Sequence, residues 1–326
     1  MRLARLVGLT AVLGAALAGA PALEAQGHGE SHETTQEVAK GLVRPESQHE
    51  ATENQIDIMH HIGNAHEIEV PFLGVYPLPQ FPPIHIGNLA IDLSPTKHLV
   101  FMLISAVLVT LVFTLTARSV ARAQAQGRPA KGFAGAMEAT ALYIRQEVIL
   151  PNVGHHGEGF VPYLLTLFFF ILTMNLLGLL PWGATATGNI AVTAALALMA
   201  FITIEIAGMR ALGAKGYLQT IFYLPPGLPT ALKPIMLIIM TPVEIIGKLS
   251  KPFALAVRLF ANMTAGHVLV LALIGLTFLF QSYVVGVGAS VLATAIMLLE
   301  LFVAFLQAFV FTLLTSVFIG LMRAEH

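Results

Sequence analysis

Residues 301–322 read LFVAFLQAFVFTLLTSVFIGLM and contain no charged side chain. Residues 159–204 and 268–299 likewise lack Asp, Glu, Lys and Arg. Because about 20 apolar residues cross the hydrocarbon core of a bilayer, uncharged stretches this long indicate membrane-spanning helices. Of the 326 residues, 56% are hydrophobic and 11% are charged, whereas a soluble domain carries about 25% charged residues. The sequence therefore predicts a membrane-embedded protein.

The charges that bound the apolar stretches predict the topology. Spans are expected at residues 99–117 and near 160–181 and 189–209. Basic residues gather in the loops at 118–145 and 210–233, so the positive-inside rule places both loops in the cytoplasm. The N-terminal arm then lies outside the cytoplasm and the C-terminus inside, with five mature spans.

The last third of the chain is too long for upright spans. From residue 234 to about 280 the sequence is largely apolar, with Pro242 and Pro252 as the only breaks. A helix of that length would be roughly 70 Å long, and residues 289–322 would add a helix of roughly 50 Å. Neither can stand upright in a hydrocarbon layer about 30 Å thick. We therefore predict an all-α polytopic membrane protein with a long, strongly tilted C-terminal hairpin that turns at residues 281–288.

The first 96 residues differ from the rest in composition. Residues 1–25 resemble a cleavable signal peptide, with two arginines, an apolar run and small residues in order; an uncleaved first span is the alternative. Residues 26–96 form an extracytoplasmic arm that is acidic and His-rich to residue 70. Five prolines in residues 70–83 exclude a regular helix and favour an extended, packed connector. Residues 97–326 then form the membrane-embedded domain.

Several classes of function are excluded by composition. The net charge is −1 and no basic patch suggests nucleic-acid binding. Cysteine is absent, which rules out disulfides and thiolate metal sites. His60, His61, His66 and Glu67 match no metalloprotease spacing and read as solvated side chains. We expect no metal, no cofactor and, because no phosphate-binding loop is present, no direct nucleotide binding.

Polar side chains inside the hairpin mark the candidate functional site, because each ionisable group in a span costs about 2.5–3.5 kcal/mol. At 100° per residue, four of them fall within about 80° of one another, subject to distortion at Pro252. They are Glu244, Lys251, Arg258 and Asn262. His267 falls on the opposite side of that helix, and Glu300 and Gln307 share a face of the next one.

Two polar surfaces with an arginine beside one of them suit a proton path in two halves. Arginine keeps its proton at any physiological pH and cannot relay one. It can hold a passing carboxylate in the ionised form and prevent protons from short-circuiting. His and Glu titrate and can pass protons to water or to a neighbour.

The string LSKPFALAVRLFANMTAGH, residues 249–267, strongly resembles the signature helix of the a subunit of F-type ATP synthases. The resemblance covers about residues 90–322 and includes TMNLLGLLP at 173–181 and ELFVAFLQAFVFTLL at 300–314. It implies a non-catalytic, proton-translocating stator subunit of a bacterial inner membrane. The implied partners are the c-subunit ring, the b subunits of the peripheral stalk, the remaining ATP synthase subunits and membrane lipid.

The resemblance also implies roles for individual residues. Arg258 resembles the essential arginine that faces the rotor ring. Glu244 resembles the acidic residue of the exit half-channel. His267 and Glu300 resemble the interacting pair of the entrance half-channel, and Asn175 resembles the asparagine near the entrance path. Asn262 matches a polar position that follows the arginine, and Gln307 matches the family's glutamine on the last helix. Ala254 stands one turn before Arg258, where the family often has a small hydroxylated residue, so that position carries no role here.

Each of these polar residues also has a structural alternative. Lys248 and Lys251 are expected to extend to the cytoplasmic interface. Asn175 and Gln307 would bond neighbouring helices. Glu205 serves either as a channel residue or as an interfacial ion pair with Arg210, and Arg258 would anchor a salt bridge to Glu244.

Two other classes of membrane protein could carry charges inside apolar helices. A secondary transporter would place the same charges around a substrate cavity, but the sequence lacks an internal repeat and its last helices are too long. An intramembrane hydrolase lacks both HExxH and a convincing nucleophile–base pair. Copurification with a ring of small proteolipids would distinguish an ATP synthase a subunit from a transporter or a hydrolase.

Overall fold

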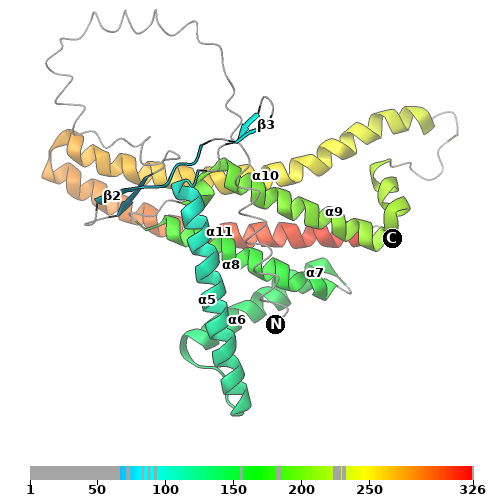
Figure 1. Ribbon diagram of the computed structural model, residues 1–326, viewed down its shortest axis with the longest axis horizontal. Helices are drawn as coiled ribbons and strands as arrows, with labels where there is room; N and C mark the ends of the chain where they lie inside the picture. Colours follow the sequence, from blue (N-terminus) through cyan, green and yellow to red (C-terminus); the bar gives the residue numbers. More distant parts are fainter. Residues whose placement is uncertain are drawn as a thin grey trace, which may run out of the picture.

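The computed structural model is that of an all-α polytopic membrane protein (Figure 1). It describes residues 67–70, 74–82, 84–86, 89–91, 94–154, 157–180, 185–222, 229 and 233–324. The predicted signal peptide, the arm up to residue 66 and the turn at residues 181–183 lie outside these residues. The helices are α5 (Lys97–Ala125), α6 (Gly132–Tyr143), the π-helix η1 (Ile144–Ile149), α7 (Leu150–Val153), the 3-10 turn η2 (Gly157–Phe160), α8 (Val161–Gly178), the 3-10 turn η3 (Ala186–Gly188), α9 (Ile190–Ile221), α10 (Lys233–Phe280) and α11 (Tyr283–Ala324).

Two short antiparallel hairpins precede the helices. Strands β1 (Glu67–Val70) and β2 (Gly74–Pro77) form one, and β3 (Ile84–Ile86) and β4 (Leu89–Ile91) form the other. The described part of residues 70–83 is extended, as its prolines predict. The expected packing is not seen at Tyr76 and Phe81, whose side chains are exposed.

Five helices in the described part of the chain are long and apolar enough to cross a membrane: α5, α8 with η2, α9, α10 and α11. In Figure 1, α5 stands across the common direction of α9, α10 and α11. If α5 crosses the bilayer upright, the long helices lie strongly tilted. This arrangement accommodates α10, whose 48 residues correspond to about 72 Å.

The core lies where α8, α9 and α11 meet the short helix α7. Its largest fully buried side chains include Leu164, Ile171, Met174, Leu196, Phe311 and Ile319. Of the most apolar 18 consecutive residues, 61% are buried in the span formed by η2 and α8. The corresponding shares are 11% in α10 and 17% in α11. Most of the surface of the α10–α11 hairpin is therefore not covered by the rest of this chain.

The hairpin turn is tighter than the sequence indicated. Only Gln281 and Ser282 separate α10 from α11, and residues 283–288, predicted as turn, are helical. Gln281 has φ of 45°, the left-handed conformation that allows a helix to reverse within so few residues. Residues 283–288 are apolar or small, so they extend α11 without exposing a charge.

Helix α9 is interrupted near its end. Its N-cap is Asn189, whose side-chain oxygen accepts a hydrogen bond of 2.8 Å from the Ala191 amide. Gly213 has φ of 71° and ψ of 169°, a combination that glycine adopts and other residues avoid. The chain bends there, and residues 214–221 form a short helical segment with a new direction.

Candidate functional site

The α10–α11 hairpin brings the predicted polar residues of its two helices into contact. Asn262 Nδ2 donates to Gln307 Oε1 at 3.0 Å. One turn further along α10, the carboxylate of Glu300 rests on Gly266, where a Cβ would overlap with it. His267, the next residue, is half-buried. Both contacts fit one antiparallel alignment of α10 with α11, because Glu300 and Gln307 lie two turns apart on α11.

Asn175 is fully buried and bridges three elements. Its Nδ2 donates to the carbonyl of Ala304 in α11 at 3.3 Å, and its Oδ1 accepts from the hydroxyl of Thr187 in η3 at 2.8 Å. Ala304 lies between Glu300 and Gln307 on α11. Asn175 therefore bonds a neighbouring helix, which was the structural alternative for this residue. This contact lies beside the polar residues of the hairpin.

The turn that carries Thr187 is itself held by a buried histidine. His98 Nδ1 lies 3.0 Å from the carbonyl of Thr185, and the hydroxyl of Thr185 donates to the Gly178 carbonyl at 3.3 Å. His98 and Thr187 are 5% and 0% exposed. Neither was predicted, because their connection to Asn175 depends on a loop conformation.

Gln307 is 1% exposed, yet its Nε2 has no hydrogen-bond partner in the part of the chain that the structure describes. A buried polar group without a partner is rare and commonly marks a place for water or for a group from another molecule. The amide pair of Asn262 and Gln307 thus has an unused donor inside the hairpin.

Arg258 is exposed on α10. Among the described residues, no hydrogen bond or ion pair involves Arg258, so the alternative salt bridge to Glu244 is not formed. Alanines at 254, 261 and 265 are also exposed, at helical spacings that put them on the face of Arg258. Small residues on a membrane helix let another helix approach its backbone closely.

The polar residues on the other side of Arg258 involve α9. Glu205 forms an ion pair with Lys248, 3.7 Å between Oε2 and Nζ. The alternative pair of Glu205 with Arg210 is not formed, since five residues place them about 140° apart around the helix. The prediction that Lys248 extends to the interface was wrong, because its side chain is 9% exposed and points to Glu205. Glu244 is half-buried one turn before Lys248.

Arg258 therefore divides the polar residues of α10 into two sets. Toward the C-terminus lie Asn262 and His267 with Glu300, Gln307 and Asn175. Toward the N-terminus lie Glu244, Lys248 and Lys251 with Glu205 from α9. Sequence reasoning missed Gly266, although a glycine inside a helix lowers its stability and so indicates a close contact.

If the chain translocates protons within an ATP synthase, as the resemblance of residues 249–267 implies, Gly266→Ala should slow proton flux and leave assembly intact. The added methyl group displaces the Glu300 carboxylate, and a misplacement of about 1 Å can cost a reacting group up to about 100-fold. The measurement is ATP-driven acidification of vesicles that contain the complex. Gly275→Ala is the matched control, since a Cβ there meets open space. Equal rates for the two variants would contradict the prediction.

This arrangement defines a class: a polytopic membrane protein in which one exposed arginine separates two sets of polar side chains along a tilted helical hairpin. Residues 99–320 match the sequence profile of the ATP synthase A chain family. ATP synthase subunit a 2 of Chlorobaculum tepidum is 46% identical over 269 residues, covering 82% of this chain and 73% of that protein. ATP synthase subunit a 2 of Prosthecochloris aestuarii is 45% identical over 289 residues, covering 88% and 85%.

A third relative, ATP synthase subunit a of Chloroherpeton thalassium, is 43% identical over 272 residues, covering 83% of this chain and 78% of the relative. The chain belongs to the ATP synthase subunit a family. It is thus a non-catalytic, multi-pass subunit of the membrane sector that associates with the rest of the complex.

Proposed function

We propose that this chain is the proton-translocating stator subunit that couples proton flow to rotation of a c-subunit ring and to ATP synthesis. The observation that carries the proposal is the exposure of Arg258 in the apolar hairpin. A charged group facing lipid at mid-membrane is costly, so its counter-charge has to come from another chain. A rotor carboxylate that arrives at Arg258 supplies that charge, and the exposed alanines around Arg258 leave room for the rotor helix.

The two polar sets on either side of Arg258 would serve as the half-channels. Asn175, Asn262, His267, Glu300 and Gln307 would form the entrance, and Glu244 with Glu205 the exit. A proton enters through the first set and neutralises a rotor carboxylate. That carboxylate circles through lipid and releases its proton into the second set. The membrane potential provides the drive, about 2.3 kcal/mol per charge per 100 mV.

Residues 97–326 would carry this activity in a bacterial inner membrane, with the arm at 26–96 outside the cytoplasm and the C-terminus inside. The basic residues within 118–145 and 210–233 support this orientation. The b subunits of the peripheral stalk would hold the chain against the rotation of the ring.

A cross-linking experiment tests the proposed partner. Ala265→Cys, on the face of Arg258, is expected to form a disulfide with a cysteine placed in the outer helix of the ring subunit. Leu103→Cys is the control, because Leu103 is 45% exposed but lies on α5. Cross-linking is measured on the assembled complex in membranes after mild oxidation. Equal yields at the two positions, or none at Ala265→Cys, would remove the support for this ring-facing surface.

A further inference from the structure

A buried polar cluster lies where α9 packs on α10, apart from the contacts within the hairpin. Its centre is the ion pair between Glu205 and Lys248, whose side chains are 12% and 9% exposed. Burying two charges costs several kcal/mol per ion unless further polar contacts satisfy them. The cluster supplies such contacts from the segment that follows Gly213.

The bend at Gly213 returns the end of α9 toward Glu205. Tyr217 in this segment donates a hydrogen bond to the Glu205 carboxylate. The Lys248 ammonium donates to the Thr220 hydroxyl at 3.0 Å and lies 4.7 Å from the centre of the Tyr217 ring. Each charged group therefore has a second polar partner.

The ion pair is loose. Hydrogen-bonded pairs between an ammonium and a carboxylate are typically about 2.7–2.9 Å apart, whereas Lys248 and Glu205 are separated by 3.7 Å. Lys248 lies closer to Thr220, at 3.0 Å. The ammonium can thus keep a hydrogen bond when the charge of Glu205 changes, and the carboxylate retains acceptor sites for another donor.

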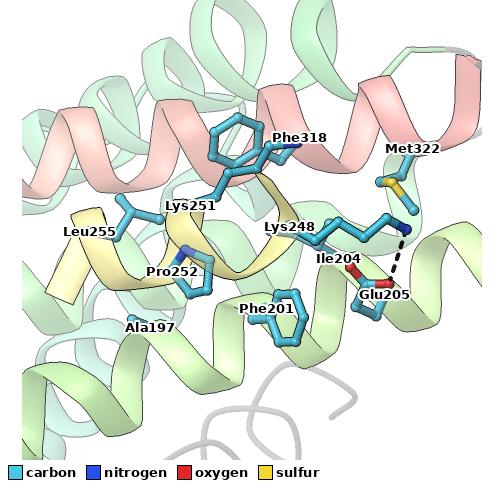
Figure 2. A pocket seen from close by; sticks show the side chains of 10 residues that line it. All are labelled: Ala197, Phe201, Ile204, Glu205, Lys248, Lys251, Pro252, Leu255, Phe318 and Met322. Carbon is cyan, nitrogen blue, oxygen red and sulfur yellow. Dashed lines mark ion pairs between the residues drawn. The ribbon is translucent and has the colours of Figure 1, made fainter. Parts of the chain in front are cut away.

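A small cavity adjoins the carboxylate (Figure 2). Its volume is about 20 Å³, which suffices for one water molecule, since about 10–15 Å³ is the minimum. The polar part of its lining consists of Glu205, Lys248 and Lys251, and the rest includes Pro252, Leu255 and Phe318. Figure 2 shows Lys248 reaching toward Glu205 while Lys251 turns toward Phe318, with its Nζ 4.9 Å from the ring centre.

The cavity lies along α10 on the way from Arg258 to the ion pair. Lys251, in its lining, precedes Arg258 by seven residues, two helical turns on about the same face. A water molecule in the cavity would contact the Glu205 carboxylate at the end of α10 that precedes Arg258. The cluster is therefore placed to receive protons released at Arg258.

We propose that Glu205, with a water molecule in this cavity, is a proton-transfer station of the exit half-channel, and that Tyr217 and Lys248 are its positioning residues. This proposal rests on the proposed proton-translocating function and assigns a specific step to that path. It adds a water site, two positioning residues and a role for the bend at Gly213.

The transfer moves one proton and leaves every group as it began. A hydronium ion formed in the cavity gives a proton to a Glu205 oxygen, so an O–H bond breaks on the ion and one forms on the carboxylate. While Glu205 is neutral, Lys248 stays bonded to Thr220. Glu205 then passes the proton to water on the exit side, and the ion pair forms again. Tyr217 donates its hydrogen bond to the carboxylate and retains its own proton.

The test uses two single variants and their combination in the intact complex reconstituted into vesicles. Glu205→Gln is expected to lower ATP-driven proton pumping by about 100-fold, the scale of a general acid–base group. Tyr217→Phe retains the ring beside Lys248 but removes the hydroxyl, and a loss of about tenfold is expected. In the double variant, Tyr217→Phe should add no further loss. Tyr143→Phe, on the exposed side of α6, is the matched control.

A purely structural lock between α9 and α10 gives different results. The Tyr217→Phe loss would then persist in the Glu205→Gln background, and the pH profile of pumping would be unchanged. Transfer through Glu205 predicts a pH profile that differs between wild type and Tyr217→Phe. The titratable groups facing this station are Glu205, Tyr217, Lys248 and Lys251, and α11 contributes uncharged Phe318 and Met322. If Glu205→Gln does not assemble, the Tyr217→Phe profile alone decides.

The two levels of the proposal fail in different ways. Pumping by the Glu205→Gln complex at the wild-type rate, in vesicles where Arg258→Ala is inactive, would overturn the transfer station and leave the proposed function intact. Absence of proton translocation by the wild-type complex would overturn the proposed function itself.

Discussion

Arg258→Ala is expected to abolish ATP-driven proton pumping and to make vesicles with the assembled complex passively permeable to protons. Breaking a desolvated charge pair costs about 3–5 kcal/mol, and each 1.4 kcal/mol is a tenfold change, so the loss of pumping should be at least about 100-fold. Without the arginine, a rotor carboxylate can pass between the two polar sets while still protonated. Pumping and passive permeability are measured on vesicles with equal amounts of assembled complex.

Arg258→Lys should fail as well. A desolvated lysine can lose its proton, and it lacks the planar set of donors that arginine offers to a carboxylate. Arg122→Ala, in the last turn of α5, is the control for removal of an arginine elsewhere. A structural anchor would instead cause loss of assembly and tolerate lysine in part. Normal pumping by assembled Arg258→Ala complex would end the proposed mechanism.

The sequence predicts the helical hairpin because length and charge spacing are local properties. The apolar segments at 234–280 and 289–322 predicted two helices longer than the bilayer, and α10 and α11 confirm this. The contact between Asn262 and Gln307 follows once the two helices are antiparallel and turned near residue 281. The turn itself was predicted too long, because residues 283–288 carry glycines and no strong periodicity.

The α9 side of the site could not be predicted in the same way. Glu205 and Lys248 belong to different helices, and their pairing depends on how α9 crosses α10. The bend at Gly213 is not visible in the apolar pattern, and it alone brings Tyr217 back to Glu205. Asn175 likewise contacts Thr187 through a turn whose conformation the sequence leaves open. Contacts across helices and through loops therefore required the three-dimensional structure.

The polar sets on the two sides of Arg258 differ in construction. Apart from Asn175 of α8, the set with Glu300 belongs to the two helices of the hairpin, and these residues are positioned by one helix register. The set with Glu205 lies between α9 and α10 and includes a loose ion pair. Substitutions in the first set should therefore change proton transfer with little effect on how α9 packs. This makes the hairpin the better place to test for a coupled pair of titrating residues.

We expect His267 and Glu300 to act as such a coupled pair. The Glu300 carboxylate rests on Gly266, next to His267, so either side chain can influence protonation of the other. His267→Ala and Glu300→Ala should each slow pumping by about 100-fold, the scale of a lost acid–base group, while assembly is unchanged. The exchange of His267→Glu with Glu300→His restores one acid and one base at the same place and should recover part of the rate. Pumping by the exchanged variant no faster than by either single variant would remove the support for direct pairing.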